Sequence, residues 1–311
     1  MSQLSQRSSN TYTIIFVVIL SFVCALILSV LASALAEPKE QAKELDRSKE
    51  MMIAAGIFTH GGYFQITNDK GEAIPAKVIQ GGVLVPGSKN DNPTREQILE
   101  VYKQRLKPFL VNSKGNRVTF EQAKIDLNEY ITKYRKEGYY KQPYKLIYEI
   151  LPNKIEEGNN NSKVEGYIIP VNGFGLWDAI YGFLAIKPDG DTVIGTSWYD
   201  QKETPGLGAN IAESSWQSLF PGKLIFQTSS TGKTDFKTTQ LGIVVVRGKV
   251  AEVLGSSPKA MSAVDGMAGA TLTGNGVTKA YQDVLAPYRP FLIKLHEEYE
   301  KNKTSQNKES S

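Results

Sequence analysis

The sequence predicts an α+β protein, in which one N-terminal transmembrane helix precedes a mixed domain of helices and a largely antiparallel sheet. Residues 12–36 form an uncharged, almost wholly apolar run, which is long enough to cross a bilayer as a helix. Beyond it, runs that open with helix-capping residues alternate with short apolar runs bounded by turn residues, the pattern of a mixed domain. The chain has 311 residues, which leaves ample material for a buried core.

Four segments follow from this pattern. We expect a short tail at residues 1–11, a transmembrane helix at 12–36, a mixed domain at 37–296, and a polar, disordered tail at 297–311.

The apolar run has a second interpretation. Its end, Ala34-Leu35-Ala36, imitates a signal-peptidase site, so a cleaved signal peptide is the alternative. The run is longer than a usual signal core and only Arg7 precedes it, which favours a retained anchor. Charge alone does not orient the chain, because basic residues follow the span closely at Lys39, Lys43, Arg47 and Lys49, yet long domains are translocated despite such charges.

Composition excludes several classes of function. The 36 basic and 32 acidic residues give a net charge of +4 without a basic block, so nucleic acid is not an expected partner. The single cysteine, Cys24, lies in the apolar run, and His60 and His296 are far apart. We therefore expect no disulfide, iron–sulfur cluster or His/Cys zinc site, and any redox chemistry requires an organic cofactor.

Periodicity, caps and turns predict the secondary structure. Helices are expected at 40–55, from the Thr94/Gln97 capping box to Pro108, from the Thr119/Gln122 capping box to Gly138, and at 211–220. Strands are expected within 58–85 and at 144–151, 164–171, 179–186, 192–199, 241–246 and 250–254, with a polar surface loop at 153–163.

The stretch Asp265–Val277 is the strongest candidate site. Thr271 and Thr273 precede an apolar, helix-forming run, so a helix is expected to begin near Asn275. Helix N-termini present free N–H groups and a partial positive charge, which suit a phosphate. The alternative is that Thr273 or Asn275 only caps the helix while the glycines permit the turn.

Two further segments are weaker candidates. Trp177 is flanked by glycine-rich sequence, and it serves either as a core residue or as a stacking surface for a planar ring. The loop Glu203–Gly208 has two glycines that let the backbone approach a ligand, and Thr204 adds a hydroxyl. It lacks the lysine of a phosphate-binding P-loop.

The pattern Asp265-x-x-x-Gly269-Ala270-Thr271 resembles the flavinylation motif, in which a dedicated transferase attaches FMN through its phosphate to the threonine. The motif usually has Ser or Thr where this chain has Ala268. Together with the single span, Leu176-Trp177 and the Glu203–Gly208 loop, it makes nearly the whole chain resemble the C subunit of the bacterial Na+-translocating NADH:quinone oxidoreductase (Na+-NQR).

This resemblance implies that residues 1–11 are a short cytoplasmic tail and that 37–296 form an extracytoplasmic FMN-binding domain, on the periplasmic side of the bacterial inner membrane. It also implies that FMN is bound covalently to Thr271 as a phosphoester. The residues that would surround the flavin are Trp177, Glu203, Thr204, Leu207, Gly208, Leu272 and Thr273. Those that would be recognised by the flavin transferase are Asp265, Gly269 and Ala270.

The resemblance also implies a role as an electron relay in a membrane complex of six subunits. The relay would accept electrons from a metal centre held by the D and E subunits and pass them to a flavin of the B subunit, while the whole complex exports Na+. Two alternatives stay open: the equivalent FMN-bearing subunit of an Rnf-type electron-transport complex, and a non-enzymatic membrane-anchored binding domain in which Thr271 is only a helix cap.

Overall fold

The computed structural model describes residues 2–153 and 164–309. Most of the polar loop that we expected at 153–163 therefore lies outside the described residues. The chain divides into two compact units, residues 1–46 and 47–311.

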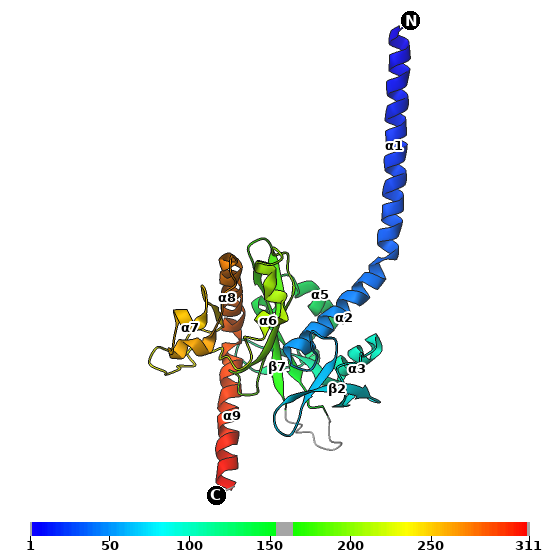
Figure 1. The fold of residues 1–311 in the computed structure, drawn as a ribbon. Helices are drawn as coiled ribbons and strands as arrows, with labels where there is room; N and C mark the ends of the chain where they lie inside the picture. Colours follow the sequence, from blue (N-terminus) through cyan, green and yellow to red (C-terminus); the bar gives the residue numbers. More distant parts are fainter. Residues whose placement is uncertain (1, 154–163, 310–311) are drawn as a thin grey trace. The chain divides into compact units, whose positions relative to one another are not determined.

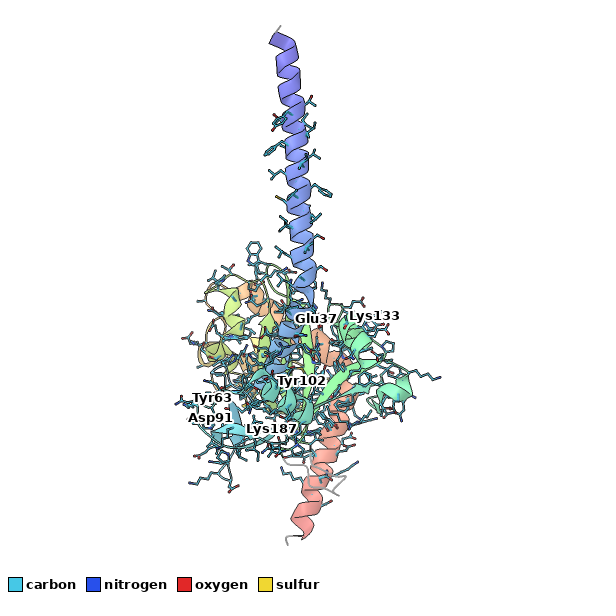
Figure 2. The ribbon with its side chains drawn as sticks, turned by 90° about the vertical axis from the view of Figure 1, so that its right-hand side faces the viewer. Glu37, Tyr63, Asp91, Tyr102, Lys133 and Lys187 are labelled. Carbon is cyan, nitrogen blue, oxygen red and sulfur yellow. The ribbon has the colours of Figure 1, made fainter. Side chains whose placement is uncertain are left out.

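The first unit consists of α1 (Ser2–Ala34) and the start of α2 (Ala36–Ala54). Thr11–Ala34 is long and apolar enough to span a membrane, and none of its most apolar window is buried. Figure 2 shows the side chains of α1 projecting on all sides of the helix. The predicted helix in the apolar run is confirmed, and so is the helix that follows it.

The second unit is built on an antiparallel sheet of six strands (Figure 1). The strand order is β5-β4-β6-β7-β8-β9, and every neighbouring pair is antiparallel, which confirms the predicted sheet type. The strands are β4 (Leu106–Val111), β5 (Arg117–Val118), β6 (Lys145–Ile150), β7 (Gly166–Phe174), β8 (Ala179–Ile186) and β9 (Val193–Asp200).

Two smaller sheets complete the β-structure of the described residues. One is an antiparallel meander of β1 (Phe64–Thr67), β2 (Ala73–Ile79) and β3 (Val83–Pro86). The other is a parallel pair, β10 (Val244–Val245) with β11 (Ala263–Val264).

The helices of this unit, besides the end of α2, are α3 (Arg95–Arg105), α4 (Phe120–Ala123), α5 (Leu127–Tyr134), α6 (Ser214–Gln217), α7 (Val250–Val253), α8 (Thr271–Leu285) and α9 (Arg289–Glu309). Short 3-10 turns are η1 (Tyr139–Lys141), η2 (Gly208–Ala212), η3 (Pro258–Ser262) and η4 (Ala286–Tyr288).

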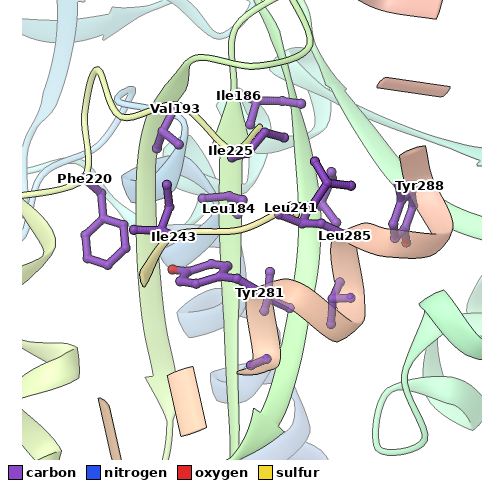
Figure 3. Close-up of a cluster of buried hydrophobic side chains, with 14 of the residues drawn as sticks. Leu184, Ile186, Val193, Phe220, Ile225, Leu241, Ile243, Tyr281, Leu285 and Tyr288 are labelled. Atoms are coloured by element: carbon purple, nitrogen blue, oxygen red, sulfur yellow. The ribbon is translucent and has the colours of Figure 1, made fainter. Parts of the chain in front are cut away.

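Helix α8 packs on the sheet and closes the main core. Its residues Val277, Tyr281, Val284 and Leu285 recur at helical spacing and are fully buried, so one face of the helix is apolar. Figure 3 shows Tyr281 and Leu285 among buried side chains from β8, β9 and the segments that follow. The Tyr281 hydroxyl accepts a hydrogen bond from Trp198 Nε1 at 3.1 Å. This buried hydrogen bond and the apolar packing together fix α8 against the sheet.

The capping box at Thr94 and Gln97 is confirmed, because each side chain accepts a hydrogen bond from the other residue's backbone N–H. The expected end of that helix was wrong. Helix α3 ends at Arg105, and Pro108 lies inside β4, opposite Tyr148 of β6. Strand β5 pairs only with the far end of β4, so proline sits where its missing N–H breaks no strand pairing.

The second capping box, at Thr119 and Gln122, is also present, but the single helix expected up to Gly138 is wrong. Lys124 adopts a left-handed conformation with φ 56°, which ends α4 after one turn. Helix α5 then begins with its own cap, in which the Asp126 carboxylate accepts from Glu129 N at 2.8 Å.

Three other expectations differ from the structure. The helix expected at 211–220 is divided into η2 and α6. The strand expected at 250–254 is helix α7, whose first N–H, at Val250, is bound by the Asp265 carboxylate, a long-range contact that the local sequence does not reveal. Helix α9 continues to Glu309, where we expected a disordered tail; its Glu and Lys residues favour helix, and no glycine or proline follows Pro290.

Asp191 → Asn is expected to stabilise the protein at neutral pH. Asp191 is 8 % exposed and accepts a hydrogen bond from Phe226 N at 2.9 Å; burial raises its pKa from 3.8 to about 6. A raised acid pKa means that the folded state holds a proton that the unfolded state releases, so stability falls as pH rises from about 4 to 6 and stays lower above that. Asn keeps the acceptor without the charge, so the variant should gain up to about 3 kcal/mol at pH 7.5.

The measurement is the free energy of unfolding of both proteins between pH 4 and pH 8. The gain should shrink steadily as pH falls toward 4. Identical pH slopes for the two proteins would show that Asp191 does not titrate in this range.

Candidate functional site

The start of α8 lies four residues earlier than expected. The helix begins at Thr271 rather than near Asn275, after Gly269 turns the chain with φ 72°. Ala270 occupies the N-cap position, and no side chain in the described part of the chain caps this end. Neither Thr273 nor Asn275 is therefore a cap. The helix presents N–H groups and a partial positive charge beside the exposed Thr271.

A buried carboxylate connects this helix to two distant segments. Glu203 is 5 % exposed, and its oxygens accept hydrogen bonds from the backbone N–H groups of Leu176 and Trp177, both at 3.0 Å. The hydroxyl of Thr273 donates to the same carboxylate at 2.5 Å. Burial alone would raise the pKa of Glu203, but these hydrogen bonds outweigh it and the pKa lies below its ordinary value. Glu203 is thus a charged anchor for the loop at 176–177.

Two glycines make room for this carboxylate. A Cβ atom at Gly175 would lie 2.5 Å from Glu203 Oε1, and one at Gly208 would lie 2.5 Å from Thr273 Oγ1. Gly208 of the Glu203–Gly208 loop is therefore required by packing around the carboxylate.

Trp177 is on the surface, with 69 % of its area exposed, so the core interpretation is wrong. Its indole Nε1 donates to the Thr204 hydroxyl at 3.1 Å, which fixes the ring. Leu207 and Leu272 are 41 % and 60 % exposed. An exposed indole held in place by a hydrogen bond provides a face on which a planar ring can stack.

A cavity of about 390 Å³ borders the start of α8. Its walls include Gly266–Thr271 on one side and Val245–Lys249 on the other, so it brings Arg247 and Lys249 near Thr271. The sequence analysis missed these two cations. The signal available was the Arg-Gly-Lys turn after an apolar strand, but only the parallel pairing of β10 with β11 brings that turn beside the motif.

Asp265 stabilises the wall of this cavity. Its carboxylate accepts from Val250 N at 2.8 Å and pairs with Lys249 Nζ at 3.0 Å. The backbone hydrogen bond from Val250, which outweighs burial, lowers the pKa of Asp265 below its ordinary range. The carboxylate therefore acts locally on the 247–250 turn.

Gly276 → Ala is expected to lower the free energy of unfolding by about 2 to 4 kcal/mol. Its added Cβ would lie 2.1 Å from the carbonyl oxygen of Phe174 at the end of β7, so the helix or the strand must move. Urea unfolding measures the effect. The neighbouring exposed Asn275, changed to Ala, is the matched control and should alter stability by less than about 0.5 kcal/mol. If both substitutions changed the free energy of unfolding by the same small amount, α8 would be able to shift away from Phe174 at little cost in stability.

Each of the two histidines contacts one neighbouring side chain. His60 Nε2 lies 3.0 Å from Gln217 Oε1, and His296 stacks on Phe236. Among residues 2–153 and 164–309, no group of three or more His, Cys, Asp or Glu side chains is arranged to hold a metal ion.

The residues at the start of α8 fit a phosphate-linked flavin. An exposed hydroxyl at an uncapped helix N-terminus suits a phosphoester, and a cavity of this size is within the range of small-molecule sites. Of the residues predicted from sequence, Trp177 is hydrogen-bonded to Thr204 and Glu203 to Thr273. The side chain of Leu207 lies next to Gly269.

Comparison with known proteins identifies the family of this chain. Residues 175–286 match the FMN-binding domain family, a range that contains the segments described above. The C subunit of the Na(+)-translocating NADH-quinone reductase of Chlamydia caviae is 42 % identical over 292 residues, covering 91 % of each chain. The C subunit from Vibrio parahaemolyticus is 30 % identical over 301 residues, covering 94 % of this chain and 98 % of that one.

The fold has a counterpart of known structure. The crystal structure of the C subunit from Parabacteroides distasonis matches with a TM-score of 0.52 and 23 % identity, covering 83 % of this chain and 96 % of that one. The sequence similarity extends along nearly the full length, the FMN-binding domain matches, and the fold is shared. The chain therefore belongs to the C-subunit family of the Na+-translocating NADH-quinone reductase, an oxidoreductase complex.

Proposed function

We propose that this chain carries FMN covalently on Thr271 and serves as an electron-relay subunit of a Na+-translocating NADH:ubiquinone reductase. The observation that carries the proposal is the exposed Thr271 hydroxyl at the uncapped N-terminus of α8. A phosphoester at this position would be stabilised by the helix N–H groups and dipole. The family membership supports the role in electron transfer.

Attachment would be made by a flavin transferase from an activated flavin phosphate, such as a flavin dinucleotide. The bond from Thr271 Oγ to phosphorus forms, the phosphoanhydride bond of the donor breaks, and the hydroxyl proton leaves with the released nucleotide. Asp265, Gly269 and Ala270 would form the recognised segment. Asp265 contributes by stabilising the adjoining turn through Val250 and Lys249.

Bound FMN supplies one- and two-electron chemistry, whereas this chain supplies position and polarity. Trp177 would offer a stacking face, held by Thr204, and Leu207 and Leu272 would shield the ring from water. The hydrogen bond between Thr273 and Glu203, with Gly208 packed against both residues, would maintain the conformation of this surface. A covalent bond would retain the cofactor in every redox state.

The family membership supports a proposal for the partners and the location. We propose a complex of six subunits in the bacterial inner membrane, with Thr11–Ala34 as the anchor and the second unit in the periplasm. Electrons would arrive from a metal centre of the D and E subunits and leave toward the flavin of the B subunit. One uncharged span offers no ion path, so Na+ export would belong to the complex.

The test is intact-mass analysis and in-gel fluorescence of the full chain, made with and without a flavin transferase. We expect a mass gain of one FMN less water only with the transferase. Fragmentation of the peptide that contains both Thr271 and Thr273 should place the added mass on Thr271. No gain in either preparation, or a gain on another residue, would refute the proposal.

A further inference from the structure

A second polar cluster of the 47–311 unit lies away from α8, where α2 and β6 meet. Arg47 of α2 is half-buried, and its Nη2 donates to the hydroxyl of Tyr148 at 3.0 Å. Tyr148 is 1 % exposed. Within residues 11–153 and 164–305, no ion pair includes Arg47. A guanidinium partly removed from water without a carboxylate partner costs free energy.

A second guanidinium reaches the same place. Arg135 pairs with Asp200 at 3.5 Å, and the two side chains are 30 % and 52 % exposed. An ion pair this long and this exposed contributes little. Arg135 also lies over the ring of Tyr199, 5.9 Å from its centroid. The cluster therefore contains two positive charges and one partly exposed carboxylate.

Arg47 and Arg135 line one small cavity of about 20 Å³. Tyr148, Tyr181, Tyr199 and Asn172 also line it. A single water-sized species requires roughly 10–15 Å³ of such space, so the cavity has room for one small particle and is too small for phosphate, sulfate or a carboxylate group.

The donors of the cluster suit an anion. The Tyr148 hydroxyl accepts from Arg47, so its own proton is available to donate, and a guanidinium has five N–H donors. The Tyr139 hydroxyl donates to the carbonyl of Ile131 and is committed elsewhere. We propose that this cavity binds a single monatomic anion, chloride or another halide, between Arg47, Arg135 and the Tyr148 hydroxyl.

The proposal is independent of the flavin. A halide there compensates the two guanidinium groups and joins α2 to β6 and to the end of β7, since Asn172 of β7 is part of the cavity wall. Binding to the folded state alone would stabilise the protein in proportion to the logarithm of halide concentration.

The experiment measures the thermal unfolding of the full chain in detergent, in sodium gluconate and in sodium chloride or bromide at equal ionic strength. We expect Tm to rise by a few degrees with halide, and to rise with the logarithm of halide concentration once that concentration exceeds the dissociation constant. Arg47 → Gln should reduce the apparent halide affinity at least about tenfold, because the main charged donor is lost. The same Tm in gluconate and chloride would mean that the cavity holds water only and would overturn the proposal, as would an unchanged halide response in the variant.

Arg105 → Gln is the matched control. Arg105 is buried and pairs with Glu165 at 2.6 Å, so this variant should lose stability and keep the halide response. If Arg47 → Gln does not fold, Tyr148 → Phe removes one donor, and it should weaken the halide response. An unchanged affinity in Tyr148 → Phe would contradict the proposed site. Crystals soaked in bromide should show an anomalous peak within this cluster, and its absence at saturating bromide would also overturn the proposal.

Discussion

Thr271 → Ala should leave the chain without any covalent flavin, whereas Thr271 → Ser should retain it. The alanine variant lacks the oxygen that forms the phosphoester, and serine restores it at the same helix position. Because Thr271 is exposed and makes no cap, its removal should change the unfolding temperature of the unmodified chain very little. Intact mass, in-gel fluorescence and thermal unfolding of the two variants check these outcomes.

Thr273 → Ser is the control for this series. Thr273 is two residues away and buried, and its hydroxyl donates to Glu203, so the serine variant should be flavinylated at Thr271. Covalent flavin in Thr271 → Ala would move the attachment site and contradict the assignment.

Glu203 → Gln should lower the free energy of unfolding by about 2 to 3 kcal/mol at pH 7. The carboxylate accepts hydrogen bonds from Leu176 N, Trp177 N and Thr273 Oγ1. An amide has only one acceptor oxygen, and its NH2 group would face donors. Loss of order at residues 176–177 should also broaden the emission band of Trp177.

The effect should depend on pH. The pKa of Glu203 is lowered from 4.5, so the stabilisation by the charged group is fully present above about 4.5 and is lost as pH falls through the folded-state pKa. The difference in the free energy of unfolding between wild type and Glu203 → Gln should therefore decrease as pH falls below about 4.5. Asp178 → Asn is the control: this carboxylate lies next to Trp177 in the chain and makes a surface pair with Lys202, and its loss should be hard to resolve. Equal effects of the two substitutions would contradict a special role for Glu203.

Local patterns predicted those elements whose determinants lie close together in sequence. The capping boxes at Thr94 and Thr119 and the strands expected at 179–186 and 192–199 were confirmed. The elements that were mispredicted depend on distant partners. Val250 begins a helix because Asp265 binds its N–H, and Pro108 is tolerated in a strand because of the pairing of β4.

The site was predictable mainly by resemblance. From residues alone, Trp177 had two interpretations, and only the fold shows that its ring is exposed and held by Thr204. Arg247 and Lys249 were missed because a turn 22 to 24 residues before Thr271 gives no local sign of lying beside it. The roles of the predicted site residues in flavin attachment stay predictions.

Because of the hydrogen bonds to Glu203, the solvent exposure of residues 176–177 does not predict how fast their amide protons exchange with solvent. Leu176 and Trp177 belong to a surface loop, and Trp177 is among the most exposed aromatic residues described outside α1. Their amide protons, however, are held by a buried carboxylate that also binds Thr273 of α8. Solvent deuterium can replace these protons only when the carboxylate releases the loop, so a segment that looks mobile by its accessibility should open as rarely as the helix to which it is bonded.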